Sequence, residues 1–106
     1  MKQKLYLPLP AAKALSKLGA DIRDARRRRR ITMALLAERA RITTDTLKQI
    51  EKGSPSTSIG GYASVLFSLG MTDRLGDIAD ARHDFTGQRL EEENLPKRIR
   101  LPKKGT

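Results

Sequence analysis

Five consecutive arginines, Arg26–Arg30, are the residues of this chain with the most distinctive chemistry. A guanidinium group stays charged at neutral pH and donates forked hydrogen bonds to phosphate or carboxylate oxygens. Two interpretations of the run stay open. Either Arg29 and Arg30 contact a phosphate backbone, or the run is a solvated helix end whose cations complement the helix dipole.

The positive charge of the chain is large and unevenly distributed. Lys and Arg total 22 against 12 Asp and Glu, which gives a formal charge of +10 and a pI near 10.5. Residues 1–30 alone hold ten basic and two acidic side chains, whereas residues 72–84 are mildly acidic. A small, strongly basic domain with such an asymmetry is expected to bind a polyanion, and nucleic acid is the favoured candidate.

The sequence argues against several other classes of protein. It has no cysteine, and the lone His83 cannot build a metal site, so we expect no disulfide, metal or cofactor. A Ser-His-Asp or Cys-His set and a phosphate-binding glycine loop are missing, so we do not expect an enzyme. No apolar run reaches the roughly 18–20 residues of a membrane span. Prolines and Lys13 interrupt the N-terminal segment, so it lacks the continuous apolar core of a signal peptide. With two Tyr, two Phe and no Trp, the chain is poorly equipped to stack on single-stranded nucleic acid.

Apolar periodicity predicts five short helices without a sheet, and therefore an all-α domain. The first helix covers residues 11 to about 29, the second follows the N-cap Thr32, and the third spans about 44–52 after the N-cap Thr43. Gly53 and Gly70 are predicted to end the third and fourth helices. The predicted inward residues of the fourth and fifth helices are Ile59, Tyr62, Val65, Leu66 and Leu69, followed by Leu75 and Ile78.

Both ends of the chain are predicted to lie outside this domain. Residues 1–10 are expected to form an extended arm because of their prolines, and the helical domain covers residues 11–84. Residues 85–106 have two prolines and mixed charge and are expected to be a flexible basic tail. Residues 5–7 and 98–101 alternate polar and apolar, so either could add a β-strand to a dimer or to another protein. A disordered tail that raises nucleic-acid affinity non-specifically is the alternative for residues 98–101.

Residues 31–53 place two short helices around a turn of about four residues. A second helix held in this way can lie in the DNA major groove, although a plain helical hairpin in a core has the same spacing. This segment resembles the Cro/cI-repressor helix-turn-helix family, also called the XRE family. The resemblance covers about residues 15–80 and is carried by Ile22-Arg23, Arg26, Ile31-Thr32-Met33, Leu36-Ala37, Leu47, Ile50-Glu51, Gly53 and Ile59–Met71. It implies a five-helix, lambda-repressor-like domain that binds double-stranded DNA.

The resemblance also implies which residues contact DNA. The expected base-reading residues, on the outward side of the third helix, are Thr44, Asp45, Thr46, Lys48 and Gln49. Asp45 has the alternative role of capping its own helix. The expected phosphate contacts are Thr32, Arg41 and Lys52, the backbone N–H groups of Met33 and Ser54, and Arg29 and Arg30 of the arginine run, with Ser56 and Thr57 as weaker additions. A partly buried, structural ion pair between Arg26 and Glu51 is implied as well.

Two residues depart from the family pattern, and one large apolar side chain is predicted to lie outside the core. Met33 stands where the family usually has a phosphate-anchoring Gln, so one side-chain contact is expected to be missing. Arg41 stands where the family usually has a Gly in the turn, and it adds a charge close to the DNA. Phe67 is predicted to point away from the core and is a candidate interface residue.

The resemblance finally implies a bacterial cytoplasmic, nucleoid-associated repressor that binds an inverted-repeat operator as a homodimer. The third helices of the two copies would lie about 34 Å apart. Residues 96–100 (PKRIR) resemble the tail of HipB-type antitoxins, which bind a HipA-like kinase toxin and repress their shared operon. The alternatives are a stand-alone phage or host repressor without a toxin, or a module whose main task is to neutralise a toxin.

Overall fold

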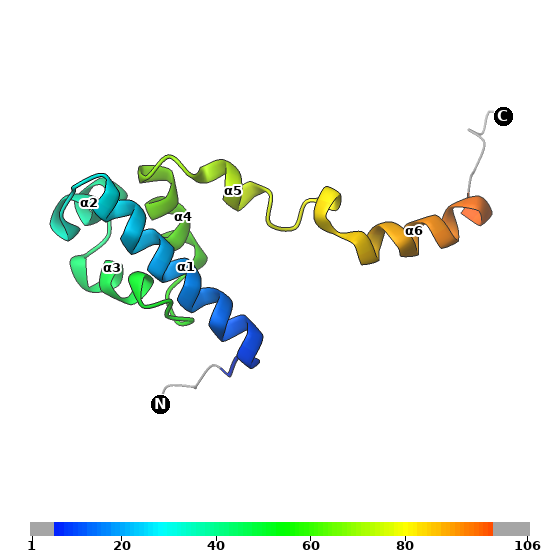
Figure 1. Ribbon diagram of the computed structural model, residues 1–106, viewed down its shortest axis with the longest axis horizontal. Coiled ribbons are helices and arrows are strands. Elements are labelled where there is room, and N and C mark those ends of the chain that lie inside the picture. Colours follow the sequence, from blue (N-terminus) through cyan, green and yellow to red (C-terminus); the bar gives the residue numbers. More distant parts are fainter. Residues whose placement is uncertain (1–5, 99–106) are drawn as a thin grey trace. The chain divides into compact units, whose positions relative to one another are not determined.

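The computed structural model describes residues 6–98, and their regular structure is entirely helical (Figure 1). The elements are α1 (Leu9–Arg28), α2 (Met33–Ala40), α3 (Thr44–Glu51), α4 (Ile59–Ser68), α5 (Thr72–Gly76), the 3-10 helix η1 (Ala81–His83) and α6 (Phe85–Arg98). No strand occurs in this range, which confirms the predicted all-α class for it.

The chain divides after Leu75 into two compact units, whereas the sequence placed the domain boundary at residue 84. In the first unit α1 packs against α3, α2 packs against α3 and α4, and α3 also contacts α4. In the second unit α6 packs against η1. The helices that carry most of the candidate site residues therefore belong to one unit.

One continuous apolar core holds α1, α2, α3 and α4 together. It consists of Ile22, Ala25, Leu36, Ala37, Ala40, Leu47, Ile50, Tyr62, Val65, Leu66 and Leu69. Full burial of a Leu, Ile or Val side chain stabilises a fold by roughly 1.5–3 kcal/mol. Because each of the four helices supplies at least two of these residues, none of them can move without opening the core.

Two residues predicted to point inward are exposed. Ile59 is 74% exposed because it begins α4, whose first turn, with Ser58 and Gly60 also exposed, is not covered by another element of its unit. Ile78 is 69% exposed because α5 ends at Gly76. Ile78 therefore lies beyond the helix, and helical spacing does not predict which way it points. The other predicted inward residues of α4 are buried.

Local signals set the ends of the short helices. The Thr32 hydroxyl accepts a hydrogen bond from the N–H of Leu35, and the Thr43 hydroxyl accepts one from the N–H of Thr46, each at 3.0 Å. Both predicted N-caps are thus confirmed. Gly53 and Gly70 have φ angles of 76° and 78°, the left-handed conformation of a residue that follows a helix.

Residues 9 and 10 of the predicted extended arm are helical. Helix α1 already begins at Leu9, with Pro8 as its N-cap and Pro10 in its first turn. A proline in the first turn lacks only an N–H group that would have no acceptor inside the helix, so it does not prevent the helix from starting there. Residues 1–5 of the predicted arm lie outside the described residues.

Residues 85–98, which were expected to belong to a flexible tail, form α6. An Asp84 carboxylate oxygen accepts a hydrogen bond from the N–H of Gly87 at 3.0 Å and so satisfies one donor of the first turn. The Gln, Arg, Leu and Glu residues that follow favour a helix by their intrinsic propensity. Residues 88–94 are all exposed, so α6 lacks the buried stripe by which periodicity detects a helix.

Candidate nucleic-acid interface

Helix α3 has one buried side and one exposed side. Its buried residues are Leu47, Ile50 and Glu51. The exposed residues include four of the five base-reading candidates, namely Thr44, Asp45, Lys48 and Gln49. The fifth, Thr46, is half-buried, and its hydroxyl accepts a hydrogen bond from the Thr43 hydroxyl at 3.0 Å. The outer side of α3 therefore presents a row of hydrogen-bonding side chains.

A three-residue turn, Arg41–Thr43, joins α2 to α3. Its first residue, Arg41, has φ 60°, and the N–H of Ile42 donates to the carbonyl of Ala37 at 3.0 Å. A left-handed conformation costs a residue with a side chain about 1 kcal/mol or more, and glycine avoids this cost. The position that the family resemblance reserves for glycine thus holds an exposed cation in a strained conformation.

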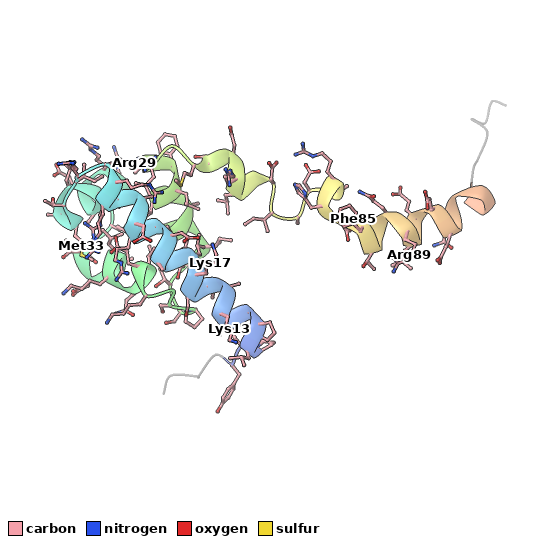
Figure 2. All side chains as sticks on the ribbon, in the orientation of Figure 1. Lys13, Lys17, Arg29, Met33, Phe85 and Arg89 are labelled. Carbon is pink, nitrogen blue, oxygen red and sulfur yellow. The ribbon has the colours of Figure 1, made fainter. Side chains whose placement is uncertain are left out.

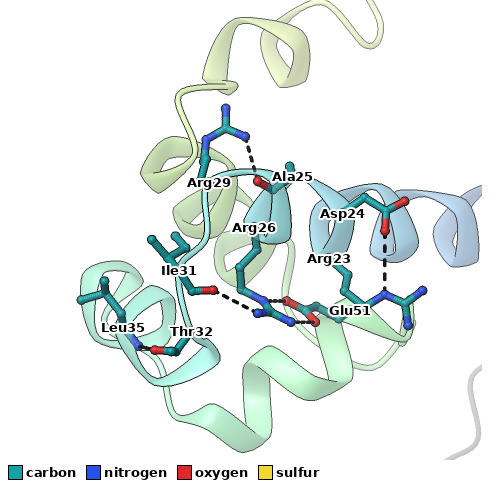
Figure 3. Close-up of polar contacts among 9 residues, drawn as sticks. All are labelled: Arg23, Asp24, Ala25, Arg26, Arg29, Ile31, Thr32, Leu35 and Glu51. Carbon is teal, nitrogen blue, oxygen red and sulfur yellow. Dashed lines mark hydrogen bonds and ion pairs between the residues drawn. The ribbon is translucent and has the colours of Figure 1, made fainter.

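A partly buried ion pair fixes α1 to the last residue of α3, as Figure 3 shows. The Arg26 Nε donates to Glu51 Oε2 at 2.8 Å, and its Nη2 donates to Oε1 at 3.2 Å. The two side chains are 12% and 4% exposed, and the Arg26 Nη1 also donates to the carbonyl of Ile31. Hydrogen bonding to Glu51 raises the pKa of Arg26 above its ordinary value. The expected pair is present and is bidentate.

Backbone contact between α1 and the C-terminal end of α3 provides a second attachment. A Cβ atom on Gly19 would lie 2.5 Å from the carbonyl oxygen of Ile50, and one on Gly53 would lie 2.4 Å from the carbonyl oxygen of Leu15. Only glycine fits at either position. Sequence reasoning missed Gly19, although a lone glycine within a helical pattern usually has a packing reason.

The loop that follows α3 is held by its own hydrogen bonds. The N–H of Ser54, expected to face a phosphate, donates instead to the carbonyl of Gln49 at 3.0 Å, and its hydroxyl lies 3.0 Å from that of Ser56. The Tyr62 hydroxyl donates to the Ser54 carbonyl at 2.8 Å, and burial raises the pKa of Tyr62. The N–H of Ser54 is therefore already used at the end of α3, and only the side chain of Ser54 can contact a phosphate without breaking that hydrogen bond.

The other phosphate candidates differ in how far they are exposed. Arg41 and Lys52 are exposed at the beginning of the α2–α3 turn and at the C-terminal end of α3. Thr32 is exposed and caps α2, whereas the Met33 side chain is half-buried. The N–H of Met33 belongs to the first turn of α2, where backbone donors have no acceptor inside the helix. These groups lie at the ends of α2 and α3.

Two residues of the arginine run, Arg26 and Arg29, form hydrogen bonds within the fold. Arg26 binds Glu51, and the guanidinium of Arg29 donates to the carbonyls of Ala25 and Leu69, each at 2.9 Å (Figure 3 shows the first of these bonds). Arg29 thus ties the end of α1 to the end of α4, a role that sequence reasoning did not assign to it. Arg30 is exposed with φ 55°, which again is a left-handed conformation.

Within the part of the chain that the structure describes, no group of three or more His, Cys, Asp or Glu side chains could hold a metal ion. None of the helices described there is both long and apolar enough to cross a membrane. The chain matches no protein-family model, no curated protein and no solved structure. Function is therefore inferred from the geometry of α3 and the residues around it.

Proposed function

We propose that this protein is a sequence-specific, double-stranded-DNA-binding repressor that inserts the outer side of α3 into the major groove. The observation that carries the proposal is that Thr44, Lys48 and Gln49 are exposed on a helix whose other side is buried. The pair between Arg26 and Glu51 fixes this helix to α1. A helix-turn-helix motif needs such a rigid, outward helix after a short turn, and the resemblance to the XRE family supports the same function.

The chemistry of the exposed side chains suits base edges. A Gln such as Gln49 can form two hydrogen bonds with adenine, and a Lys such as Lys48 can donate to guanine, each good pair discriminating by about 1–3 kcal/mol. Thr44 can hydrogen-bond or contact a thymine methyl group. Arg41, Lys52 and the first turn of α2 would position the helix through phosphate contacts, which carry no sequence information themselves.

Operator recognition on this scheme uses a homodimer. A single eight-residue α3 reads only a few base pairs, and two copies related by a two-fold axis would read an inverted repeat whose halves lie about 34 Å apart. The net charge of +10 favours association with DNA. Each phosphate contact adds about −0.9 to the slope of log affinity against log salt concentration.

Charge reversal tests the proposal. The full-length protein is titrated, by fluorescence anisotropy, into a duplex selected from a random library and into an unrelated duplex. Wild type is expected to prefer the selected duplex by at least about 1,000-fold. Lys48→Glu with Lys52→Glu is expected to weaken binding on the order of 100-fold, because each change removes an attraction and adds a repulsion.

A matched control separates local contact from overall charge. Lys13→Glu with Lys17→Glu changes the net charge equally, at exposed residues in the N-terminal half of α1 (Figure 2). This variant is expected to lose less than about tenfold in affinity, through long-range attraction alone. An equal loss in both variants, or no loss in the α3 variant, would contradict the proposed interface.

An antitoxin role is a second candidate, supported by the resemblance of residues 96–100 to HipB-type tails. Residues 96–98 are the end of α6, and residues 99–100 lie outside the described residues. Helix α6 exposes Phe85 and Leu90 to 71% and 52%, together with Glu91–Glu93, so it offers an uncovered surface to a protein partner. Co-purification with the product of the neighbouring gene, a HipA-like kinase toxin on this proposal, tests the role. If the protein purifies alone from its native host, a stand-alone repressor is the better description.

A further inference from the structure

No residue of α4 belongs to the proposed DNA contacts. Charged residues make up 32% of the chain, yet residues 53–72, which contain α4, include none. On this helix Ile59 and Phe67 are 74% and 73% exposed. An uncharged helix face with two large exposed apolar side chains is a candidate surface for contact with another protein.

The shape of this face combines a protrusion with a hollow. Phe67 stands beside a hollow of about 630 Å³, whose α4 side is formed by the small residues Gly60, Gly61 and Ser64. Its other residues include Arg39 and the DNA-contact candidates Arg41 and Thr46. Gly60, Ser64 and Phe67 are spaced by four and three residues and so lie on one side of the helix. An exposed aromatic side chain beside a hollow that contains arginine residues fits a subunit interface, where aromatic residues and Arg are enriched.

Gly60 has no explanation within the chain. A Cβ atom there would meet nothing nearer than the Ser58 hydroxyl at 3.7 Å, whereas one on Gly53 would lie 2.4 Å from a backbone oxygen. Glycine inside a helix is less favourable than alanine because it loses more conformational freedom. The open space in front of Gly60 is therefore not needed by the fold of a single chain.

We propose that two copies of this chain form their two-fold dimer through the outer face of α4. In an isologous interface the same surface supplies both the protrusion and the hollow, and this face has both. With the two α4 helices antiparallel, Phe67 of each copy lies over Gly60 of its partner, and Ala63 and Ser64 lie nearest the two-fold axis. Because each copy carries a charge of +10, contact through α4, which has no charged residue of its own, brings fewer like charges together than contact through the arginine-rich end of α1, although Arg39 and Arg41 line the hollow.

This inference rests on the proposed function in one respect, since the operator-binding scheme requires a homodimer. Helix α4 packs directly against α3 in the same unit. A two-fold axis beside α4 would relate the two α3 helices to each other, and an inverted repeat requires two α3 helices related in this way. Dimerisation itself can be measured without DNA, so the two proposals can fail separately.

Analytical ultracentrifugation of the full-length protein without DNA provides the test. Phe67→Asp is compared with Phe85→Asp, which is the same substitution at a phenylalanine of similar exposure on α6. Wild type and Phe85→Asp are expected to dimerise alike. Phe67→Asp is expected to weaken the dimer at least about 30-fold, as at a central interface residue. A monomeric wild type, an unweakened Phe67→Asp dimer, or equal damage by Phe85→Asp would overturn the inference.

Cross-linking provides a second readout that does not depend on how well Phe67→Asp folds. The natural chain has no cysteine, so a single introduced thiol can pair only with the same position in another copy. Ala63→Cys is expected to form a disulfide-linked dimer under mild oxidation, whereas Ala34→Cys, at an exposed position on α2, is not. Equal cross-linking at both positions, or none at position 63, would contradict an α4 interface. Selective binding of the duplex by a dimer that forms elsewhere would leave the proposed function intact.

Discussion

Helices α3 and α6 both present exposed polar residues, but they are held in different ways. The eight-residue α3 buries Leu47, Ile50 and Glu51, and α1 contacts its C-terminal end. The 14-residue α6 exposes every side chain from residue 88 to residue 94. An isolated helix shorter than about 12–15 residues is marginal in water, so α3 owes its helical form to packing, whereas α6 relies more on local propensity. A helix that is to read DNA needs the first kind of support.

The largest effect on stability is expected from breaking the ion pair that holds α3. Glu51→Ala leaves the Arg26 guanidinium without its partner at a site where the two side chains are 12% and 4% exposed. We expect a loss of about 3–5 kcal/mol in the free energy of unfolding, measured by urea denaturation. The double variant Arg26→Met with Glu51→Leu should recover most of this loss, because no charge is left unpaired. A loss below about 1 kcal/mol for Glu51→Ala would show that the pair does not hold α3.

The same truncation in the two helices should have unequal effects. Leu47 is fully buried in α3, whereas Leu90 is 52% exposed on α6. Leu47→Ala is expected to cost about 2–5 kcal/mol, and Leu90→Ala no more than about 0.5 kcal/mol, both in urea denaturation. Similar losses at the two positions would mean that α6 is anchored as α3 is, and the contrast between the helices would be wrong.

Replacing Arg41 should separate stability from binding. Arg41→Gly removes left-handed strain and is expected to raise the free energy of unfolding by about 1 kcal/mol while weakening the binding of duplex DNA up to about tenfold. Arg30→Gly relieves the same kind of strain at the end of α1 and should be equally stabilising. Its effect on DNA affinity decides whether Arg30 contacts phosphate or is a solvated helix end. A destabilised Arg41→Gly protein, or one with unchanged affinity, would contradict this account of the turn.

The smallest effect concerns the loop that follows α3. Burial raises the pKa of Tyr62 above its ordinary value of 10.0, so the folded state holds the phenol proton more tightly than the unfolded state does. The resulting stabilisation is complete below pH 10 and is lost as the pH rises through the folded-state pKa. Urea denaturation between about pH 8 and 11 should therefore show a steeper loss for wild type than for Tyr62→Phe. Parallel curves would mean that the loop is not fixed through a buried Tyr62.

The sequence predicted those parts of the fold that depend on neighbouring residues. Thr32 and Thr43 were recognisable as N-caps because a hydroxyl at that position satisfies a first-turn donor. Gly53 was recognisable as a helix end, and its left-handed φ confirms it. The core residues of α1 to α4 follow from three- and four-residue spacing, with the exception of Ile59 at the edge of α4.

The remaining features depend on what approaches a residue in space. Nothing near Gly19 in the sequence shows that the end of α3 touches it, and nothing near Arg29 shows that the carbonyl of Leu69 lies within reach. Helix α6 was missed because periodicity detects buried stripes, and α6 has none among residues 88–94. The exposed row on α3 and the ion pair between Arg26 and Glu51 could be predicted by position, but the close contact of Gly19 with the end of this helix could not.

The central claim is that α3, rather than α6 or the basic end of α1, enters the duplex. Titration of isotope-labelled protein with the selected duplex, followed residue by residue in NMR spectra, tests it most directly. We predict that the largest changes affect the backbone amides of residues 44–49, while those of residues 87–94 stay near their free positions. Changes concentrated in residues 87–94 or 26–30, with residues 44–49 unaffected, would contradict it.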